Sequence, residues 1–95
     1  MLFIGGWYDI YTDGVLDGFA AVRARGGTKA RAHSKLVMGP WLHNTDQLTN
    51  GLLEFPKARL VGMSKARGFL DYWVRGVANG FDSKEPSISY YQMGI

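Results

Sequence analysis

The sequence predicts an α/β fold with a parallel sheet, and the order of its segments points to it. Short apolar runs stand at residues 2–4 and 35–38, and glycine follows each of them. Such runs are typical of buried strands. A segment with helical character lies between the two runs. The resulting order of strand, helix and strand is that of a parallel βαβ unit with covered faces.

The helix between these strands is predicted from its start, its apolar face and its end. Thr12 or Asp13 is placed to cap the start. The apolar face would consist of Val15, Leu16, Phe19 and Val22. Two glycines at residues 26–27 predict a left-handed helix terminus. A polar, basic connection at residues 28–34 would then lead into the second strand.

The second half of the chain contains a long loop, one clear helix and a terminal strand. Residues 41–56 are typical of a loop, and a loop of this length usually has a function or is disordered. A helical stripe follows, with apolar residues at Ala66, Phe69, Leu70, Trp73, Val74 and Val77. We expect this stripe to be core, and Asn79 and Gly80 to end the helix. A polar linker at residues 81–86 precedes an alternating strand at 87–93.

Composition excludes several classes of protein. The chain has 95 residues, of which 46% are hydrophobic and 14% aromatic, so it is too rich in apolar area for a disordered chain. No apolar run approaches the ~18–20 residues of a membrane span. No signal peptide is visible, which leaves the compartment open with cytoplasm as the default. The absence of cysteine excludes a disulfide scaffold and a thiolate metal site.

Asp9 and His43 are the candidate catalytic residues, because each follows a predicted parallel strand. Catalytic groups of open α/β sheets lie beyond the carboxyl ends of the strands, so both side chains would share one edge. A carboxylate there could hold one imidazole nitrogen and leave the other free for proton transfer. Spacing alone also permits plainer roles, with Asp9 bracing a turn and His43 as an ordinary loop histidine.

Two local motifs are more specific than this spacing. Residues 5–9 read Gly-Gly-Trp-Tyr-Asp, and residues 39–43 read Gly-Pro-Trp-Leu-His. They resemble the segments that carry the triad acid and base in cocaine-esterase-like serine hydrolases. That family includes Xaa-Pro dipeptidyl-peptidases, α-amino-acid ester hydrolases and glutaryl acylases. The resemblance therefore implies that Asp9 is the triad acid and His43 the triad base.

The resemblance also implies how the chain is organised. Residues 69–76 are similar to the last helix of the family's catalytic domain, and residues 88–94 to the first strand of its jelly-roll domain. We therefore expect a fragment of an α/β-hydrolase fold, with the last two parallel strands and their helices in residues 1–80. A linker and the first jelly-roll strand would occupy residues 81–95. The implied substrates are esters, amides or peptides, with no cofactor and no metal.

Two departures from the family pattern stand out. Leu42 and Asn44 flank His43, where the family often has a small or hydroxyl residue before the histidine and glycine after it. The family's nucleophilic serine and oxyanion-hole donors lie upstream of the triad acid, and no such segment precedes Asp9 here. The 95 residues alone are therefore expected to be inactive.

Several other residues have side chains that could take part in catalysis or bind a metal. Ser64 stands in a segment that imitates a nucleophile elbow, but the order acid, base, serine does not fit this fold, so Ser64 is expected to cap a helix. His43 with Asp9 and Asp46 would make a poor zinc site. His33 is expected to be solvated. Three aromatic residues beside the motifs would line a substrate pocket or pack under loops: Trp7, Tyr8 and Trp41.

A basic cluster supports an alternative function. It consists of Arg23, Arg25, Lys29, Arg31 and Lys35. The alternative is a small basic module that binds nucleic acid or another anion, but no stacking aromatic interrupts the cluster. The net charge of +3 is mild. We expect a small-molecule ester or peptide substrate, neither nucleic acid nor membrane as partner, and self-association through exposed sheet edges.

Overall fold

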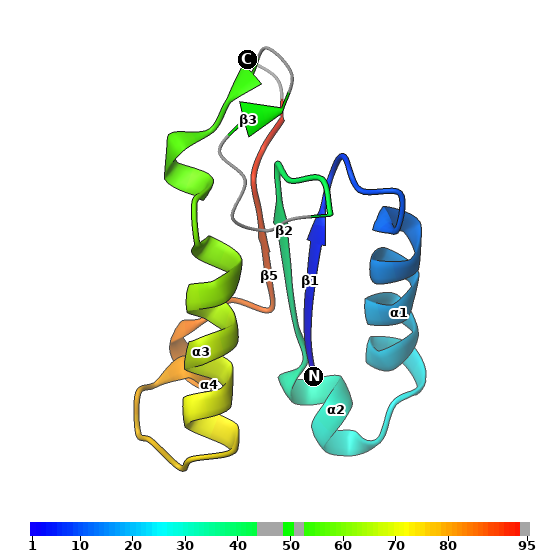
Figure 1. The fold of residues 1–95 in the computed structure, drawn as a ribbon. Helices are drawn as coiled ribbons and strands as arrows, with labels where there is room; N and C mark the ends of the chain where they lie inside the picture. Colours follow the sequence, from blue (N-terminus) through cyan, green and yellow to red (C-terminus); the bar gives the residue numbers. More distant parts are fainter. Residues whose placement is uncertain (44–48, 51–52, 94–95) are drawn as a thin grey trace.

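A three-stranded parallel sheet forms the centre of the molecule (Figure 1). The computed structural model describes residues 1–43, 49–50 and 53–93. The strands are β1 (Leu2–Gly6), β2 (Lys35–Gly39) and β5 (Ile88–Tyr90), and they lie in the order β1-β2-β5. Both pairings are parallel. The predicted α/β class with a parallel sheet is therefore confirmed.

The central strand β2 is buried along its whole length. Its register with β1 runs from Leu2 opposite Lys35 to Gly6 opposite Gly39. Because the two strands end level with each other, the loops that follow them leave the sheet side by side. The register therefore determines which residues meet at the carboxyl edge.

Helix α1 (Thr12–Arg25) covers one face of the sheet (Figure 1). The buried centre of this face consists of Phe19, Leu36 and Met38. Phe3, Trp7, Val15 and Leu16 pack around them. The predicted apolar face of the helix is thus confirmed for Val15, Leu16 and Phe19. Burial of side chains of this size is the main stabilising contribution that the helix makes, at about 1.5–3 kcal/mol for each fully buried one.

The two ends of α1 differ in detail from the prediction. Tyr11 occupies the N-cap position without a side-chain cap, and the Thr12 hydroxyl donates instead to the carbonyl oxygens of Gly6 and Asp9. Gly26 ends the helix in an extended conformation, with φ −67° and ψ 168°. The left-handed terminus was therefore wrong. An extended pair of glycines leads the chain directly into a second helix, α2 (Thr28–His33), for which Gly27 is the N-cap.

Helix α3 (Val61–Trp73) lies on the opposite face of the sheet. The buried residues there are Val37, Trp41 and Ala58, with Leu2, Ile4, Phe55, Val61 and Tyr91 packed around them. The chain reaches α3 through a short antiparallel pair, β3 (Thr49–Asn50) and β4 (Leu53–Glu54), and a 3-10 turn, η1 (Pro56–Ala58). The predicted long loop therefore contains some regular structure.

The boundaries and burial of α3 correct two predictions. The helix begins at Val61 after Leu60, which has φ 58°, so Ser64 lies inside the helix and does not cap it. It ends at Trp73 rather than at residues 79–80. Much of the predicted core stripe is exposed: Leu70, Trp73, Val74 and Val77. The physical reason is that the last turns of α3 extend past the amino ends of the strands, where there is no sheet to cover them (Figure 1).

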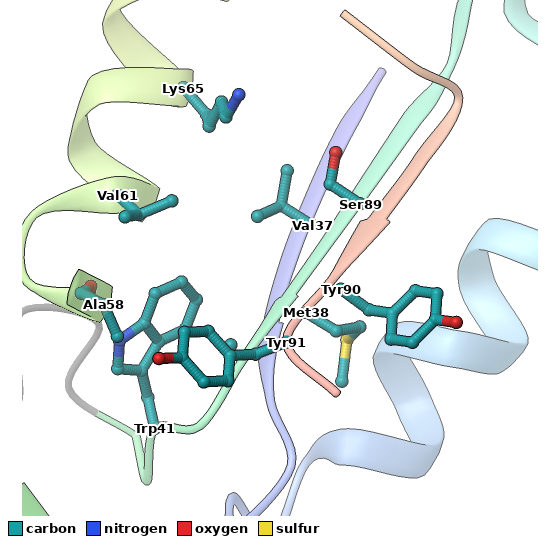
Figure 2. Close-up of a pocket in the computed structure, with 10 residues that line it drawn as sticks. Val37, Met38, Trp41, Ala58, Val61, Lys65, Ser89, Tyr90 and Tyr91 are labelled. Carbon is teal, nitrogen blue, oxygen red and sulfur yellow. The ribbon is translucent and has the colours of Figure 1, made fainter. Parts of the chain in front are cut away.

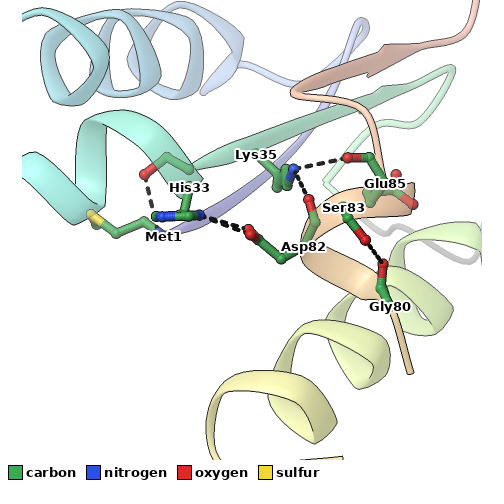
Figure 3. A network of polar contacts seen from close by, with 8 residues as sticks. Met1, His33, Lys35, Gly80, Asp82, Ser83 and Glu85 are labelled. Carbon is green, nitrogen blue, oxygen red and sulfur yellow. Dashed lines mark hydrogen bonds and ion pairs between the residues drawn. The ribbon is translucent and has the colours of Figure 1, made fainter. Parts of the chain in front are cut away.

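A fourth helix, α4 (Phe81–Lys84), stands where the sequence predicted a polar linker. Phe81 is 8% exposed and packs edge-to-face on Phe69 of α3. Lys35, at the start of β2, is 5% exposed. Its ammonium donates to the carbonyl oxygens of Asp82 and Glu85, each at 2.8 Å (Figure 3). A buried cation is stable here because carbonyl oxygens replace its lost water.

His33 belongs to the same polar cluster, and its prediction as a solvated residue was wrong. Its Nδ1 lies 2.9 Å from the carboxylate of Asp82 (Figure 3). Its ring also packs edge-to-face on Trp73, with the centroids 5.5 Å apart. Tertiary contacts between α2, α3 and α4 bring these residues together, and nothing in the local sequence around His33 signals them.

The terminal strand is present, and its partner is β2. Among the described residues, no helix has both the length and the apolar character needed to cross a membrane. The domain boundary after residue 80 and self-association through exposed edges stay predictions.

We predict that Lys35→Met destabilises the fold by about 1–3 kcal/mol, because the carbonyl oxygens of Asp82 and Glu85 lose their donor. Methionine retains the apolar stem of the side chain, so the change isolates the ammonium. Urea unfolding would measure the effect. Lys29→Met is the matched control: it removes the same charge from an exposed position of α2 and should change stability by less than about 0.5 kcal/mol. Equal effects of the two substitutions would refute the assignment.

Candidate active site

Asp9 and His43 lie together at the carboxyl edge of the sheet. Asp9 is in the loop that follows β1, and His43 is in the loop that follows β2. The Nδ1 atom of His43 is 3.0 Å from Oδ2 of Asp9. The structure therefore brings together the two residues that the sequence singled out, over a separation of 34 positions.

Backbone hydrogen bonds hold these two loops against each other beyond the ends of the strands. The amide of Trp7 donates to the carbonyl of Gly39 at 2.9 Å, and the amide of Tyr8 donates to the carbonyl of Trp41 at 3.0 Å. The approach is so close that a Cβ on Gly6 would lie 2.1 Å from the Trp41 carbonyl oxygen. Glycine at position 6 is therefore required by the contact that brings Asp9 to His43.

The buried side chain of Trp41 anchors the loop that follows β2. It is 1% exposed, and its indole N–H donates to the carbonyl of Ala58 at 3.2 Å. Figure 2 shows its side chain beside Ala58 and Tyr91. The indole also lies over Gly39, where a Cβ would come within 2.3 Å of the ring. The motif from Gly39 to His43 thus combines a tight turn and a buried anchor with an exposed histidine at its end.

The carboxylate of Asp9 is held by its own loop. Its Oδ1 accepts a hydrogen bond from the amide of Tyr11 at 3.0 Å, which leaves Oδ2 for His43. The Asp9 carbonyl accepts from the hydroxyl of Thr12 at 2.7 Å. The side chain is 10% exposed. The two carboxylate oxygens thus have separate partners, and the orientation of the group is determined from both sides.

These contacts keep Asp9 ionised. The hydrogen bond from His43, followed by the one from the Tyr11 amide, lowers the pKa of the Asp9 carboxyl below its ordinary value of 3.8. Both contacts favour the charged form because they donate to a carboxylate. At neutral pH, Asp9 therefore only accepts hydrogen bonds.

The protonation pattern of His43 follows from this. A carboxylate cannot donate, so the hydrogen bond requires a proton on Nδ1, which we assign from the chemistry of the partner. Nε2 of the neutral ring then carries a lone pair. The His43 side chain is 80% exposed, and its ring packs edge-to-face on Tyr11 with the centroids 5.3 Å apart. The pair is therefore arranged for proton transfer at Nε2.

Comparison with known proteins bears on this part of the chain. Residues 1–45 match the family model of the X-Pro dipeptidyl-peptidase (S15 family). The match contains β1, α1, α2 and β2, and both Asp9 and His43. It confirms the resemblance stated from the two motifs and indicates a hydrolase related to X-Pro dipeptidyl-peptidases. No curated protein matches the chain significantly.

The predicted pocket residues lie in two different places. Trp7 and Tyr8 line an open hollow with Tyr90, Tyr91, Gln92 and Met93. The Trp7 indole donates to the carbonyl of Tyr91 at 2.9 Å, and Tyr8 is 39% exposed. Trp41 instead lines an apolar hollow between the sheet and α3 (Figure 2). A role for these three residues in holding substrate stays a prediction.

Two alternatives from the sequence can also be placed. Ser64 lines a hollow between α3 and α4 with Gly80 and Lys84, and neither Asp9 nor His43 lines that hollow. Asp46, considered as a metal ligand, lies outside the described residues. Within the described ranges, no group of three or more His, Asp or Glu side chains could hold a metal ion.

Sequence reasoning missed Tyr11 as part of the site. The signal for its amide was available, because an aspartate commonly accepts a hydrogen bond from the backbone two residues further on. The ring contact with His43 carried no local signal. It depends on the packing of two loops that are 32 residues apart in the sequence from Tyr11 to His43.

We predict that Gly6→Ala weakens the loop contact and destabilises the fold by about 1–3 kcal/mol, because the added Cβ overlaps the Trp41 carbonyl oxygen. Urea unfolding would measure the loss. The control is Gly14→Ala in α1, where an added Cβ would meet nothing within 4 Å. This substitution should stabilise the fold by about 0.5–1 kcal/mol, because alanine has the higher helix propensity. Destabilisation of similar size at both positions would contradict the steric explanation.

We also predict a pH-dependent contribution from Asp9. Its pKa is lower in the folded state than the ordinary 3.8, so its contribution to stability is complete above that pH and disappears as the pH falls through the folded pKa. The measurement is the difference in urea midpoint between the wild type and Asp9→Asn across acid pH. This difference should shrink towards zero in strong acid. A constant difference for Asp9→Asn over this pH range would refute the prediction.

Proposed function

We propose that this chain supplies the acid and the base of the catalytic triad of a serine hydrolase. The observation that carries the proposal is the hydrogen bond between Nδ1 of His43 and Oδ2 of Asp9 at the carboxyl edge of the sheet. Both residues lie inside the part of the chain that matches the X-Pro dipeptidyl-peptidase family. The proposed substrates are acyl compounds: esters, or amides and peptides of the Xaa-Pro type.

In the proposed mechanism, His43 transfers protons and Asp9 maintains its tautomer. Nε2 accepts the proton of a serine hydroxyl as the serine oxygen attacks the substrate carbonyl carbon. The same nitrogen then returns the proton to the leaving alcohol or amine. Water repeats the sequence on the acyl-enzyme and regenerates the serine. Throughout, the negative charge of Asp9 stabilises the imidazolium that forms and disappears in each half-reaction.

The nucleophile in this proposal comes from a segment other than residues 1–95. Among the described residues, the hydrogen-bonding partner of His43 is Asp9, and no serine hydroxyl shares that bond. Ser64 lies on α3 and lines a different hollow. The proposal therefore also expects the 95-residue chain by itself to lack turnover.

The same proposal assigns the fold. The sheet would be the last part of the strand order of an α/β-hydrolase domain, ending near residue 80, with residues 81–95 as linker and first strand of a jelly-roll domain. The order of the acid before the base along the chain supports the hydrolase assignment. No cofactor is needed, since the proposed chemistry uses side chains alone.

The test uses the protein in which this segment is joined to its nucleophile. Asp9→Asn should lower kcat by about 10³–10⁴-fold, and His43→Ala by at least as much, since Asn holds the wrong tautomer and Ala removes the base. Hydrolysis of a chromogenic ester and of an Xaa-Pro anilide would report it. His33→Ala is the matched control and should retain turnover. Full activity after loss of His43, or turnover by the 95-residue chain that Ser64→Ala abolishes, would sink the proposal.

A further inference from the structure

Few contacts restrain the orientation of the His43 imidazole. It is 80% exposed, and a single hydrogen bond to Asp9 leaves the ring able to turn away into solvent. Within the described part of the chain, the ring also makes an edge-to-face contact with Tyr11, at 5.3 Å between centroids and 60° between planes. Tyr11 is therefore the second restraint on the ring.

Tyr11 is itself well placed to act as a restraint. Its amide donates to Oδ1 of Asp9 at 3.0 Å, and its carbonyl accepts from the amide of Val15 at 3.1 Å. It also occupies the N-cap position of α1. The backbone that carries the ring is thus tied both to the carboxylate and to the first turn of the helix, so the ring is attached at a defined place beside the Asp9–His43 pair.

The fold has no other evident use for this ring. Tyr11 is 58% exposed and belongs to neither of the two buried clusters that hold α1 and α3 to the sheet. A large aromatic side chain that is exposed on one side and packed against an imidazole on the other contributes little to the core. Its contact with His43 is the interaction that accounts for its place.

We infer that Tyr11 is a positioning residue for the proposed general base: its ring keeps the imidazole of His43 on the carboxylate of Asp9, with Nε2 directed away from it. This inference rests on the proposed function. It adds to the acid and base a third residue, which acts on the geometry of the base and not on the substrate. An aromatic ring is required, because an edge-to-face contact depends on the charge distribution of the ring.

The test reads the imidazole directly in the 95-residue chain by ¹⁵N nuclear magnetic resonance, in mildly alkaline solution where an imidazole is neutral. The ratio of Nδ1–H to Nε2–H tautomers of His43 should fall about two- to tenfold in Tyr11→Ala and in Tyr11→Leu. Tyr11→Phe should behave as the wild type. In parallel, the pKa of the Asp9 carboxyl, followed by ¹³C resonance, should rise towards its ordinary value in the Ala and Leu variants.

Tyr90→Ala is the matched control, because Tyr90 is an equally exposed tyrosine on β5 and should leave the His43 signals unchanged. Tyr11→Leu preserves bulk at the start of α1, so the ring is tested separately from the fold, and urea midpoints verify that each variant remains folded. An unchanged tautomer ratio in both Ala and Leu variants overturns the inference. A loss in Tyr11→Phe equal to that in Tyr11→Ala also overturns it, since the ring would then not be the cause.

Failure of the proposed function gives a different pattern. If His43 of the wild-type chain shows no excess of the Nδ1–H tautomer, the hydrogen bond between Asp9 and His43 is not formed, and both proposals fail. If the wild type shows an excess of the Nδ1–H tautomer and the Tyr11→Ala and Tyr11→Leu variants show the same excess, only the positioning role of Tyr11 is refuted. If turnover survives His43→Ala while the tautomer results hold, the catalytic proposal fails and the restraint on the ring stands as a structural fact.

Discussion

The backbone ladder between β1 and β2 continues after the two strands end, and the site depends on that continuation. Two further hydrogen bonds, from Trp7 to Gly39 and from Tyr8 to Trp41, carry the pairing into the loops. They are possible because Gly6 presents no Cβ to the Trp41 carbonyl. Without this close approach, the two loops that carry Asp9 and His43 would lie farther apart, and neither side chain would be close enough to orient the other.

Side chains buried on the two faces of the sheet also help to position Asp9 and His43. Phe19 secures α1, which begins three residues after Asp9. The amide of Tyr11, at the N-cap of this helix, donates to the Asp9 carboxylate, and the hydroxyl of Thr12 donates to the Asp9 backbone carbonyl. Trp41 is buried on the opposite face and anchors the loop that ends in His43. Asp9 is therefore positioned from one face of the sheet and His43 from the other. The imidazole of His43 lies exposed at the end of its loop, whereas the carboxylate of Asp9 is largely covered.

At the amino end of the sheet, a buried charge makes the main contacts. Lys35 is buried at the start of the central strand, and its ammonium is satisfied by the backbone of α4. The cation that the sequence placed in a basic cluster is thus used inside the fold. Lys65 is likewise paired with Glu85 at 2.6 Å, so α3 and α4 are connected by charge as well as by Phe81. The burial of Lys35 removes one cation from the basic cluster on which the anion-binding alternative depended.

Local sequence patterns were sufficient to predict the parallel βαβ unit, the helix after Asp9 and the two residues of the candidate site, because apolar runs, helical spacing and glycine-bounded motifs specify them. Long-range packing instead sets the partner of β5, the helical form of residues 81–84 and the exposure of Trp73 and Val77. It also sets the contacts of His33, Lys35 and Tyr11. Each of these depends on which surfaces meet across the sheet. A local pattern specifies that a side chain is apolar or charged, but the neighbour that buries or pairs it is brought there by a distant part of the chain.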